Sequence, residues 1–234
     1  ITDLQNNIIT TQRNIDFILE DTDDCLNKIC QAIENFLTSC SIDRSKLLGV
    51  GVCIAGRVNP ETGRSYKYFT SNPQSLAEII ESYIGHPVLI ENDTRAKCYG
   101  EYTKGCTGDE KNIIYLNLGR GVAIGIIVDG KIYYGRSGFA GEFGHTPFFE
   151  NEIICDCGKK GCLETEVSGI AIENKMIAQI QKGRNTILME KYNHTGKIHI
   201  TDIISAARND DNLSIELIEE AGEKIGKSIA FLIN

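Results

Sequence analysis

Residues 145 to 162, HTPFFENEIICDCGKKGC, place four possible zinc ligands in one short segment. The four side chains, one imidazole and three thiols, belong to His145, Cys155, Cys157 and Cys162. The spacing C-x-C-x4-C with an upstream histidine is typical of a tetrahedral zinc site. Gly158 and Gly161 let the backbone double back, so that three thiolates can point at one metal. Four protein ligands leave no place for a bound water, so the sequence predicts a structural zinc rather than a catalytic one.

Buried or redox-active thiols are the alternative explanation of this segment. The chain has nine cysteines, and the odd number weakly disfavours a disulfide framework. The remaining six fall in or beside predicted helices and strands, where we expect packed thiols. They are Cys25, Cys30, Cys40, Cys53, Cys98 and Cys106.

The elements that must position these residues alternate between strands and helices. LLGVGVCIAG is an apolar run typical of a strand covered on both faces, and PVLIEN is a strand that ends at Asp93. NIIYLNLGRGVAIGIIVDGKIYYG predicts two strands joined by a glycine-rich turn, then a hairpin turn at Asp129-Gly130. Helices are expected over 23–40 and 75–84, in a segment that carries Ala96 and Tyr99, and over 164–183, 201–208 and 213–232. The order predicts an α/β protein.

Charge and hydropathy exclude some classes of function for this segment. The formal net charge is −8, whereas binding to the phosphate backbone of a nucleic acid needs clustered lysine and arginine. Any basic DNA-binding element is therefore expected outside this chain. No apolar run approaches eighteen residues, and the start ITDLQNN has no secretory signal, so we expect a cytoplasmic protein without a membrane partner.

Four motifs together resemble the ROK family, which groups bacterial sugar-responsive repressors with sugar kinases. They are GVGVCIAGRVNPETG, PVLIENDTRAKCYGE, LNLGRGVAIGIIVDGKI and GFAGEFGHTPF followed by CDCGKKGCLETEVSG. They occur in the family's order over nearly the whole chain. The resemblance implies the two-domain actin-like ATPase (ribonuclease H-like) fold, with sugar bound in the cleft between domains and zinc on the histidine and cysteines. We expect a smaller domain at 1–107 and a larger one at 108–234, both cut at the chain ends.

The resemblance also assigns roles to single residues. Asn92 matches a sugar-binding asparagine, and Asp93 matches the catalytic base that would accept a sugar hydroxyl proton in a kinase. Gly56 and Arg57 match a loop that closes over the sugar. The glutamates and histidine that contact sugar hydroxyls correspond to Glu142, His145 and Glu164. A solvated surface charge is the alternative for any single carboxylate, and the joint occurrence of the motifs favours a pocket.

The segment Gly119-Arg120-Gly121 departs from the phosphate loop of the kinases. Those enzymes have threonine where this chain has Arg120, and glycines where it has Ala123 and Ile124. Side chains there would hinder close approach of backbone N–H groups to phosphates. The change resembles the family's repressors, closest to the N-acetylglucosamine and xylose types, although an arginine could itself bind phosphate.

We therefore expect the sugar-binding effector and oligomerisation domain of a ROK-type repressor. The implied partners are a sugar or sugar-phosphate effector, a second copy in a homodimer or homotetramer, and operator DNA contacted through a helix-turn-helix outside this chain. The rival is a hexose or N-acetylhexosamine kinase that uses Mg-ATP, with Asp93 as general base. A third possibility is a pseudoenzyme whose zinc segment only mediates protein contacts.

Overall fold

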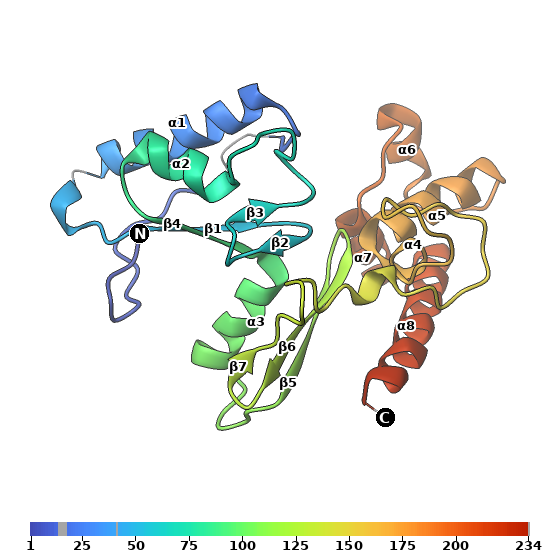
Figure 1. Cartoon of the computed structure of the whole chain (residues 1–234). Helices are drawn as coiled ribbons and strands as arrows, with labels where there is room; N and C mark the ends of the chain where they lie inside the picture. Colours follow the sequence, from blue (N-terminus) through green and yellow to red (C-terminus); the bar gives the residue numbers. More distant parts are fainter. Residues whose placement is uncertain (14–17, 41, 234) are drawn as a thin grey trace. The chain divides into compact units, whose positions relative to one another are not determined.

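The chain forms two compact units in the computed structural model, which describes residues 1–13, 18–40 and 42–233 (Figure 1). Unit 1 comprises residues 1–103 and 134–140, and unit 2 comprises residues 104–133 and 141–234. A short stretch of chain between two parts of unit 2 thus belongs to unit 1. The division into domains at residue 107 stays a prediction for the whole protein.

Unit 1 is built on a parallel strand pair, β1 (Val50–Ile54) and β4 (Val88–Asn92), in which Val50 pairs with Val88 and Ile54 with Asn92. Its other elements are an antiparallel pair and three α-helices: β2 (Val58–Asn59), β3 (Arg64–Ser65), α1 (Asp23–Ser39), α2 (Leu76–Ile84) and α3 (Asp93–Lys104), with a 3-10 turn η1 (Arg44–Lys46). Helices α1 and α2 lie over the sheet (Figure 1) and share one apolar core with it.

Helix caps explain where the first two helices begin. The Thr22 hydroxyl accepts a hydrogen bond from the Cys25 N–H at the start of α1. At α2, Ser75 and Glu78 form a reciprocal capping box, and Gly85 ends the helix with a φ of 70°. Both helices then present apolar side chains to the strands.

Only one face of the β1–β4 sheet is covered in the described part of the chain, so the prediction of a strand buried on both faces is wrong. Gly51, Cys53 and Leu89 are exposed, whereas Ile54 and Ile90 on the opposite face are buried. The reason is that α1 and α2 pack on the same side and successive strand residues point to opposite faces.

The packed-thiol prediction holds for Cys25, Cys30 and Cys98, which are buried. Cys40 is half-buried. The prediction is wrong for Cys53, on the open sheet face, and for Cys106, which follows α3; both are exposed.

Unit 2 combines an antiparallel sheet with a group of helices. The sheet has the order β5 (Ile113–Leu118), β6 (Val122–Val128), β7 (Lys131–Ile132). Asp129 and Gly130 both have positive φ, as the predicted hairpin turn requires. The helical elements are η2 (Phe143–His145), α4 (Glu164–Val167), α5 (Gly169–Gln181), α6 (Met189–Thr195), α7 (Ile200–Arg208) and α8 (Asn212–Ile233).

The helical core of unit 2 follows the predicted apolar stripes, with two differences. Met176, Ile203 and Leu213, from α5, α7 and α8, are almost fully buried together. The expected helix over 164–183 is interrupted at Ser168, whose extended backbone separates α4 from α5 and whose side chain caps α5. Helix α6 was not predicted. Among the described residues, no helix is both long and apolar enough to cross a membrane.

Candidate functional site

The predicted zinc ligands converge in unit 2. One ligand atom from each of the four side chains lies within 4.8 Å of the other three, and the ligands are His145, Cys155, Cys157 and Cys162. The Nδ1 atom of His145 lies 3.4 Å from Sγ of Cys155, and the sulfur atoms of Cys157 and Cys162 are 3.6 Å apart. Zinc bonds of about 2.3 Å to sulfur and about 2.0 Å to nitrogen place tetrahedral ligands about 3.5 to 3.8 Å apart. The residues present therefore fit a structural zinc.

The loop that carries the cysteines is folded by its own backbone. The Cys155 N–H donates to the Lys159 carbonyl, and the Gly158 N–H donates back to the Cys155 carbonyl, each at 2.8 Å. Gly161 has a φ of +73°, and a Cβ there would lie 1.9 Å from the Phe149 carbonyl oxygen. Gly158 has a φ of +83° with open space around it. Both glycines are needed for the turn, and Gly161 also for close backbone approach.

The His145 ring is oriented so that its two nitrogens have different neighbours. Nδ1 faces the thiols, while Nε2 lies 3.7 Å from Oε2 of Glu142, three residues earlier. Both side chains are half-buried. A metal on Nδ1 would fix the ring and leave Nε2 and the Glu142 carboxylate available to a ligand.

Glu164 contacts the turn between β5 and β6. Its Oε2 accepts a hydrogen bond of 2.9 Å from the Val122 N–H, and a Cβ on Gly121 would lie 2.5 Å from the same oxygen. The Gly119 carbonyl accepts from the Gly169 N–H at the start of α5. The Glu164 carboxylate therefore occupies a backbone N–H group of the kind that binds phosphate oxygens in phosphate loops. Its negative charge would repel the negative charge of a phosphate group at this turn.

Asn92, the last residue of β4 in unit 1, is buried and caps the start of α3. Its Oδ1 accepts from the N–H groups of Thr94 and Arg95, both at 3.0 Å. Its Nδ2 donates to the Gly56 carbonyl at 2.9 Å. Three predicted residues, Gly56, Asn92 and Asp93, are thus brought together at the carboxyl end of β4.

Asp93 and Arg57 remain partly or largely open to solvent in unit 1. Oδ2 of Asp93 lies 3.4 Å from Nζ of Lys97, one turn along α3, and its side chain is 32% exposed. The Arg57 guanidinium lies 5.8 Å from the centre of the Phe139 ring. The carboxylate of Asp93 can therefore still accept a hydrogen bond from a hydroxyl group.

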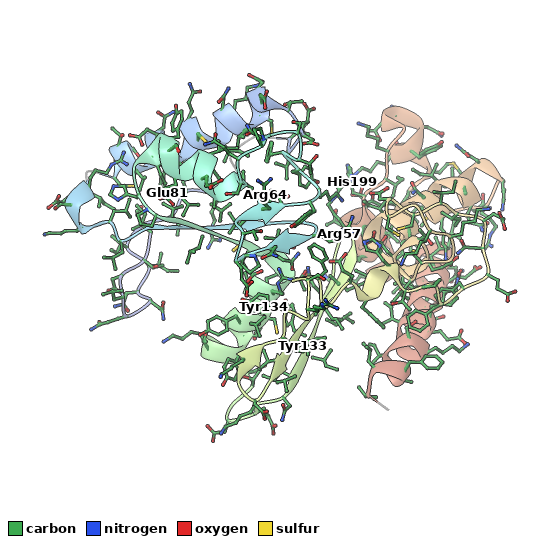
Figure 2. The ribbon with its side chains drawn as sticks, in the orientation of Figure 1. Arg57, Arg64, Glu81, Tyr133, Tyr134 and His199 are labelled. Carbon is green, nitrogen blue, oxygen red and sulfur yellow. The ribbon has the colours of Figure 1, made fainter. Side chains whose placement is uncertain are left out.

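Sequence reasoning missed a buried arginine next to these residues. Arg95 is 4% exposed and forms an ion pair of 2.7 Å with Glu91. The Tyr134 hydroxyl, labelled in Figure 2, donates to the other Glu91 oxygen at 2.9 Å. Burial and the Glu91 carboxylate raise the pKa of Tyr134 to about 12. Glu91 lies in strand β4 and Arg95 in helix α3, so the helical i, i+4 pattern does not apply and did not predict this ion pair.

Unit 2 also has a second group of charges, which contacts the cysteine loop (residues 145–162) through Asn151. Glu166 is 7% exposed, and its carboxylate accepts from Asn151 at 2.6 Å and Lys175 at 2.9 Å, and also from Lys224. Burial alone would raise the pKa of Glu166, but the two ammonium groups outweigh burial and hold it below its usual value. This network ties the loop to α4, α5 and α8.

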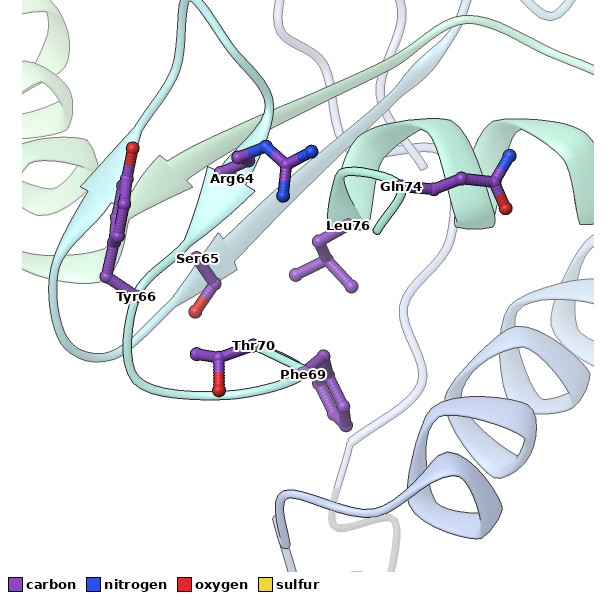
Figure 3. Close-up of a pocket in the computed structure, with 7 residues that line it drawn as sticks. All are labelled: Arg64, Ser65, Tyr66, Phe69, Thr70, Gln74 and Leu76. Carbon is purple, nitrogen blue, oxygen red and sulfur yellow. The ribbon is translucent and has the colours of Figure 1, made fainter. Parts of the chain in front are cut away.

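Unit 1 also has a small cavity of about 120 Å³, drawn in Figure 3. None of the predicted sugar or metal residues lines it. The lining residues are Arg64, Ser65, Tyr66, Phe69, Thr70, Gln74 and Leu76. We therefore do not assign the cavity to the predicted site.

Residues 1–234 match the ROK family. A glucokinase of Halalkalibacterium halodurans is 31% identical over 209 residues, which are 88% of this chain and 63% of that protein. A xylose repressor of Caldicellulosiruptor bescii is 30% identical over 220 residues, 92% of this chain and 54% of that protein. A solved ROK family transcriptional regulator, a homologue of the Escherichia coli MLC protein, superposes with a TM-score of 0.79 at 33% identity, over 97% of this chain and 56% of that one.

These comparisons confirm the predicted resemblance and the α/β, actin-like fold class. The chain spans between about half and two thirds of the length of these relatives. The relatives include both a kinase and a repressor, so kinship alone does not separate the two activities.

Proposed function

Because this chain belongs to the ROK family, we propose that it is the sugar-binding effector and oligomerisation part of a cytoplasmic ROK transcriptional repressor. Operator DNA is contacted through a region outside this chain, and the chain itself carries a net charge of −8. The observation that carries the proposal is in the β5–β6 turn, where the Glu164 carboxylate accepts a hydrogen bond from the Val122 N–H. A sensor needs a sugar site, but it does not need a phosphate loop.

In this proposal each unit carries side chains that recognise sugar hydroxyl groups. In unit 2, Glu142 and Glu164 accept hydrogen bonds from hydroxyl groups, and His145 donates from Nε2. Zinc, when bound, fixes the cysteine loop and the imidazole ring. In unit 1, Asn92 and Asp93 contact further hydroxyls, with Gly56 and Arg57 in the adjoining loop. Sugar binding then favours one arrangement of the repressor over another, and the sugar can shift the population only by its difference in affinity for the two.

The turn at Gly119-Arg120-Gly121 supports a sensor rather than a kinase. A phosphate loop stabilises anionic oxygens with free backbone N–H groups in a small-residue turn. Here the Val122 N–H already donates a hydrogen bond to the Glu164 carboxylate. The charge of Glu164 and the missing free donor both weaken binding of a nucleotide phosphate.

A sugar kinase is the second candidate, and the exposure of the Asp93 carboxylate favours it. The carboxylate is partly exposed at the start of α3, and glucokinases are among the relatives. In that case Asp93 accepts the proton of the attacking sugar hydroxyl, and Mg-ATP is the co-substrate. We rank the kinase second because of the occupied turn.

Calorimetric titration of the full-length protein with hexoses, pentoses, N-acetylhexosamines and their phosphates tests the proposal. We expect one of these ligands to bind, and Glu142→Gln to weaken it about tenfold or more by removing a charged acceptor. Glu150→Gln, a change of the same kind at an exposed position outside the site, should leave the affinity unchanged. Absence of binding to every ligand in the panel, by a folded protein that holds zinc, contradicts the proposal and favours a role in protein contacts.

A further inference from the structure

Residues 134–140 form a closed loop that packs with unit 1, although the chain on both sides of it belongs to unit 2. The loop ends meet, because the Ala140 N–H donates to the Tyr134 carbonyl at 3.1 Å. Gly138, near its tip, has a φ of +77°, and a Cβ there would lie 3.5 Å from the Asn59 side chain. The loop is therefore a defined element of unit 1 rather than a simple connection.

One buried arginine holds this loop against the strands. Arg95 donates from Nη1 to the Gly138 carbonyl at 2.7 Å and from Nη2 to the Val58 carbonyl at 2.8 Å. Its Nε donates to Glu91, and Glu91 accepts from the Tyr134 hydroxyl on its other oxygen. The Tyr134 ring also lies 5.1 Å from the guanidinium carbon. The Glu91–Arg95 pair thus fixes the first residue of the loop and its tip at the same time.

The loop in turn supports the side chain of Arg57. The Phe139 ring lies 5.8 Å from the Arg57 guanidinium and meets the Tyr66 ring edge-on, with centroids 5.1 Å apart. The Tyr66 N–H donates to the Arg57 carbonyl at 2.8 Å. Arg57 is exposed, so the Phe139 ring, which Tyr66 contacts in turn, is the support of its side chain rather than burial.

We propose that Arg95 is a positioning residue for the proposed sugar-binding residues of unit 1. Arg95 holds the loop 134–140 on unit 1 by its hydrogen bond to the Gly138 carbonyl, and the loop places Phe139 against Arg57. Through Glu91, whose carboxylate also accepts from the Asn92 N–H at 2.6 Å, the same pair fixes the end of β4. A lysine cannot replace Arg95, because a single ammonium cannot reproduce the planar fork that reaches three acceptors in fixed directions. This inference rests on the proposed sugar-binding function.

Limited trypsin digestion, without any sugar present, measures how firmly the loop 134–140 stays packed on unit 1. Arg136 lies exposed in the loop, and cleavage after it requires the loop to open. Arg95→Met and Arg95→Lys remove hydrogen bonds that hold the loop, so we expect cleavage after Arg136 to be at least about tenfold faster in the full-length protein. Mass spectrometry of the fragments measures the rate. Arg184→Met is the matched control, because the Arg184–Glu216 pair has the same 2.7 Å length but is exposed and lies in unit 2. It should leave cleavage after Arg136 unchanged.

Two milder variants keep the inference testable if Arg95→Met does not fold. Tyr134→Phe removes only the hydroxyl bond to Glu91 and should accelerate cleavage about two- to fivefold. Phe139→Leu keeps the backbone acceptor of Arg95, so it should weaken sugar binding without changing cleavage. Unchanged cleavage in both a folded Arg95 variant and Tyr134→Phe overturns the proposed seating of the loop.

Calorimetry with the sugar that binds the wild-type protein supplies the second readout. We expect Arg95→Lys and Phe139→Leu to lower the affinity about tenfold, and Arg184→Met to leave it unchanged. Faster cleavage with full sugar affinity contradicts the positioning role. If the wild-type protein binds no sugar of the panel, the proposed function fails, whereas the digestion still decides whether Arg95 seats the loop.

Discussion

Replacing Glu166 by glutamine should destabilise unit 2 and loosen the cysteine loop together. The carboxylate is buried and receives hydrogen bonds from Asn151, Lys175 and Lys224. Glutamine keeps the shape but removes the charge, which leaves two ammonium groups in a partly buried position. Removing one partner of a buried ion pair costs about 3 to 5 kcal/mol. Both lysines also contact Glu220, which is 41% exposed and compensates part of their charge. We therefore expect the free energy of unfolding to fall by about 3 kcal/mol, the low end of this range.

Thermal unfolding followed by circular dichroism checks this value. A loss of about 3 kcal/mol lowers the Tm by roughly 6 to 12 °C for a protein of this size. Glu223→Gln is the matched control, because Glu223 lies on the same helix α8 and pairs with Lys227 in full solvent exposure. It should leave the Tm unchanged. Equal effects of the two substitutions refute the inference that burial makes the Glu166 network important.

The same network gives this stability a defined pH dependence. The Glu166 pKa is held below its usual value in the folded state, so its contribution is fully present above about pH 4.5 and is lost as the pH falls through the lower folded value. Burial opposes the charge of Lys224, but Glu166 and Glu220 outweigh it and raise the Lys224 pKa. That contribution is present below about pH 10.5 and is lost at higher pH. Glu166→Gln should therefore show a weaker loss of Tm on acidification than the wild-type protein.

Two further pairs of substitutions test the cysteine loop. Cys157→Ser removes a zinc ligand and should lower the zinc content, measured by mass spectrometry, from one per chain to near zero, whereas the exposed Cys106→Ser should retain it. Gly161→Ala places a Cβ against a backbone carbonyl as well as at positive φ, so it should release zinc to a chelator much faster than the wild-type protein. Gly158→Ala has only the φ penalty, about 1 kcal/mol, and should release zinc more slowly than Gly161→Ala. Equal release rates contradict the assignment of Gly161 to close backbone approach.

Local sequence patterns predicted most elements, because periodicity and caps act over a few residues. The strand VLIEN, its end at Asp93 and the hairpin at Asp129-Gly130 are examples. Contacts between distant segments left no such signal. The exposure of Cys53 depends on which face of the sheet the helices cover, and that choice is made by tertiary packing.

The candidate site shows the same distinction. The four zinc ligands were predicted because their spacing within one loop nearly determines their convergence. The bond from Glu164 to the β5–β6 turn was not predicted, since it joins segments more than forty residues apart. The burial of Arg95 under a loop that starts at Tyr134 was invisible for the same reason. These long-range contacts now supply the main support for the sensor and for the positioning role.

Release of ADP by the full-length protein, with Mg-ATP and a sugar that calorimetry has shown to bind, tests the central proposal most directly. A repressor's sensor domain should bind the sugar yet release no ADP above the rate without sugar, because the Val122 N–H is taken by Glu164. Sustained sugar-dependent turnover that is abolished by Asp93→Asn would contradict the proposal and establish a sugar kinase with Asp93 as its base.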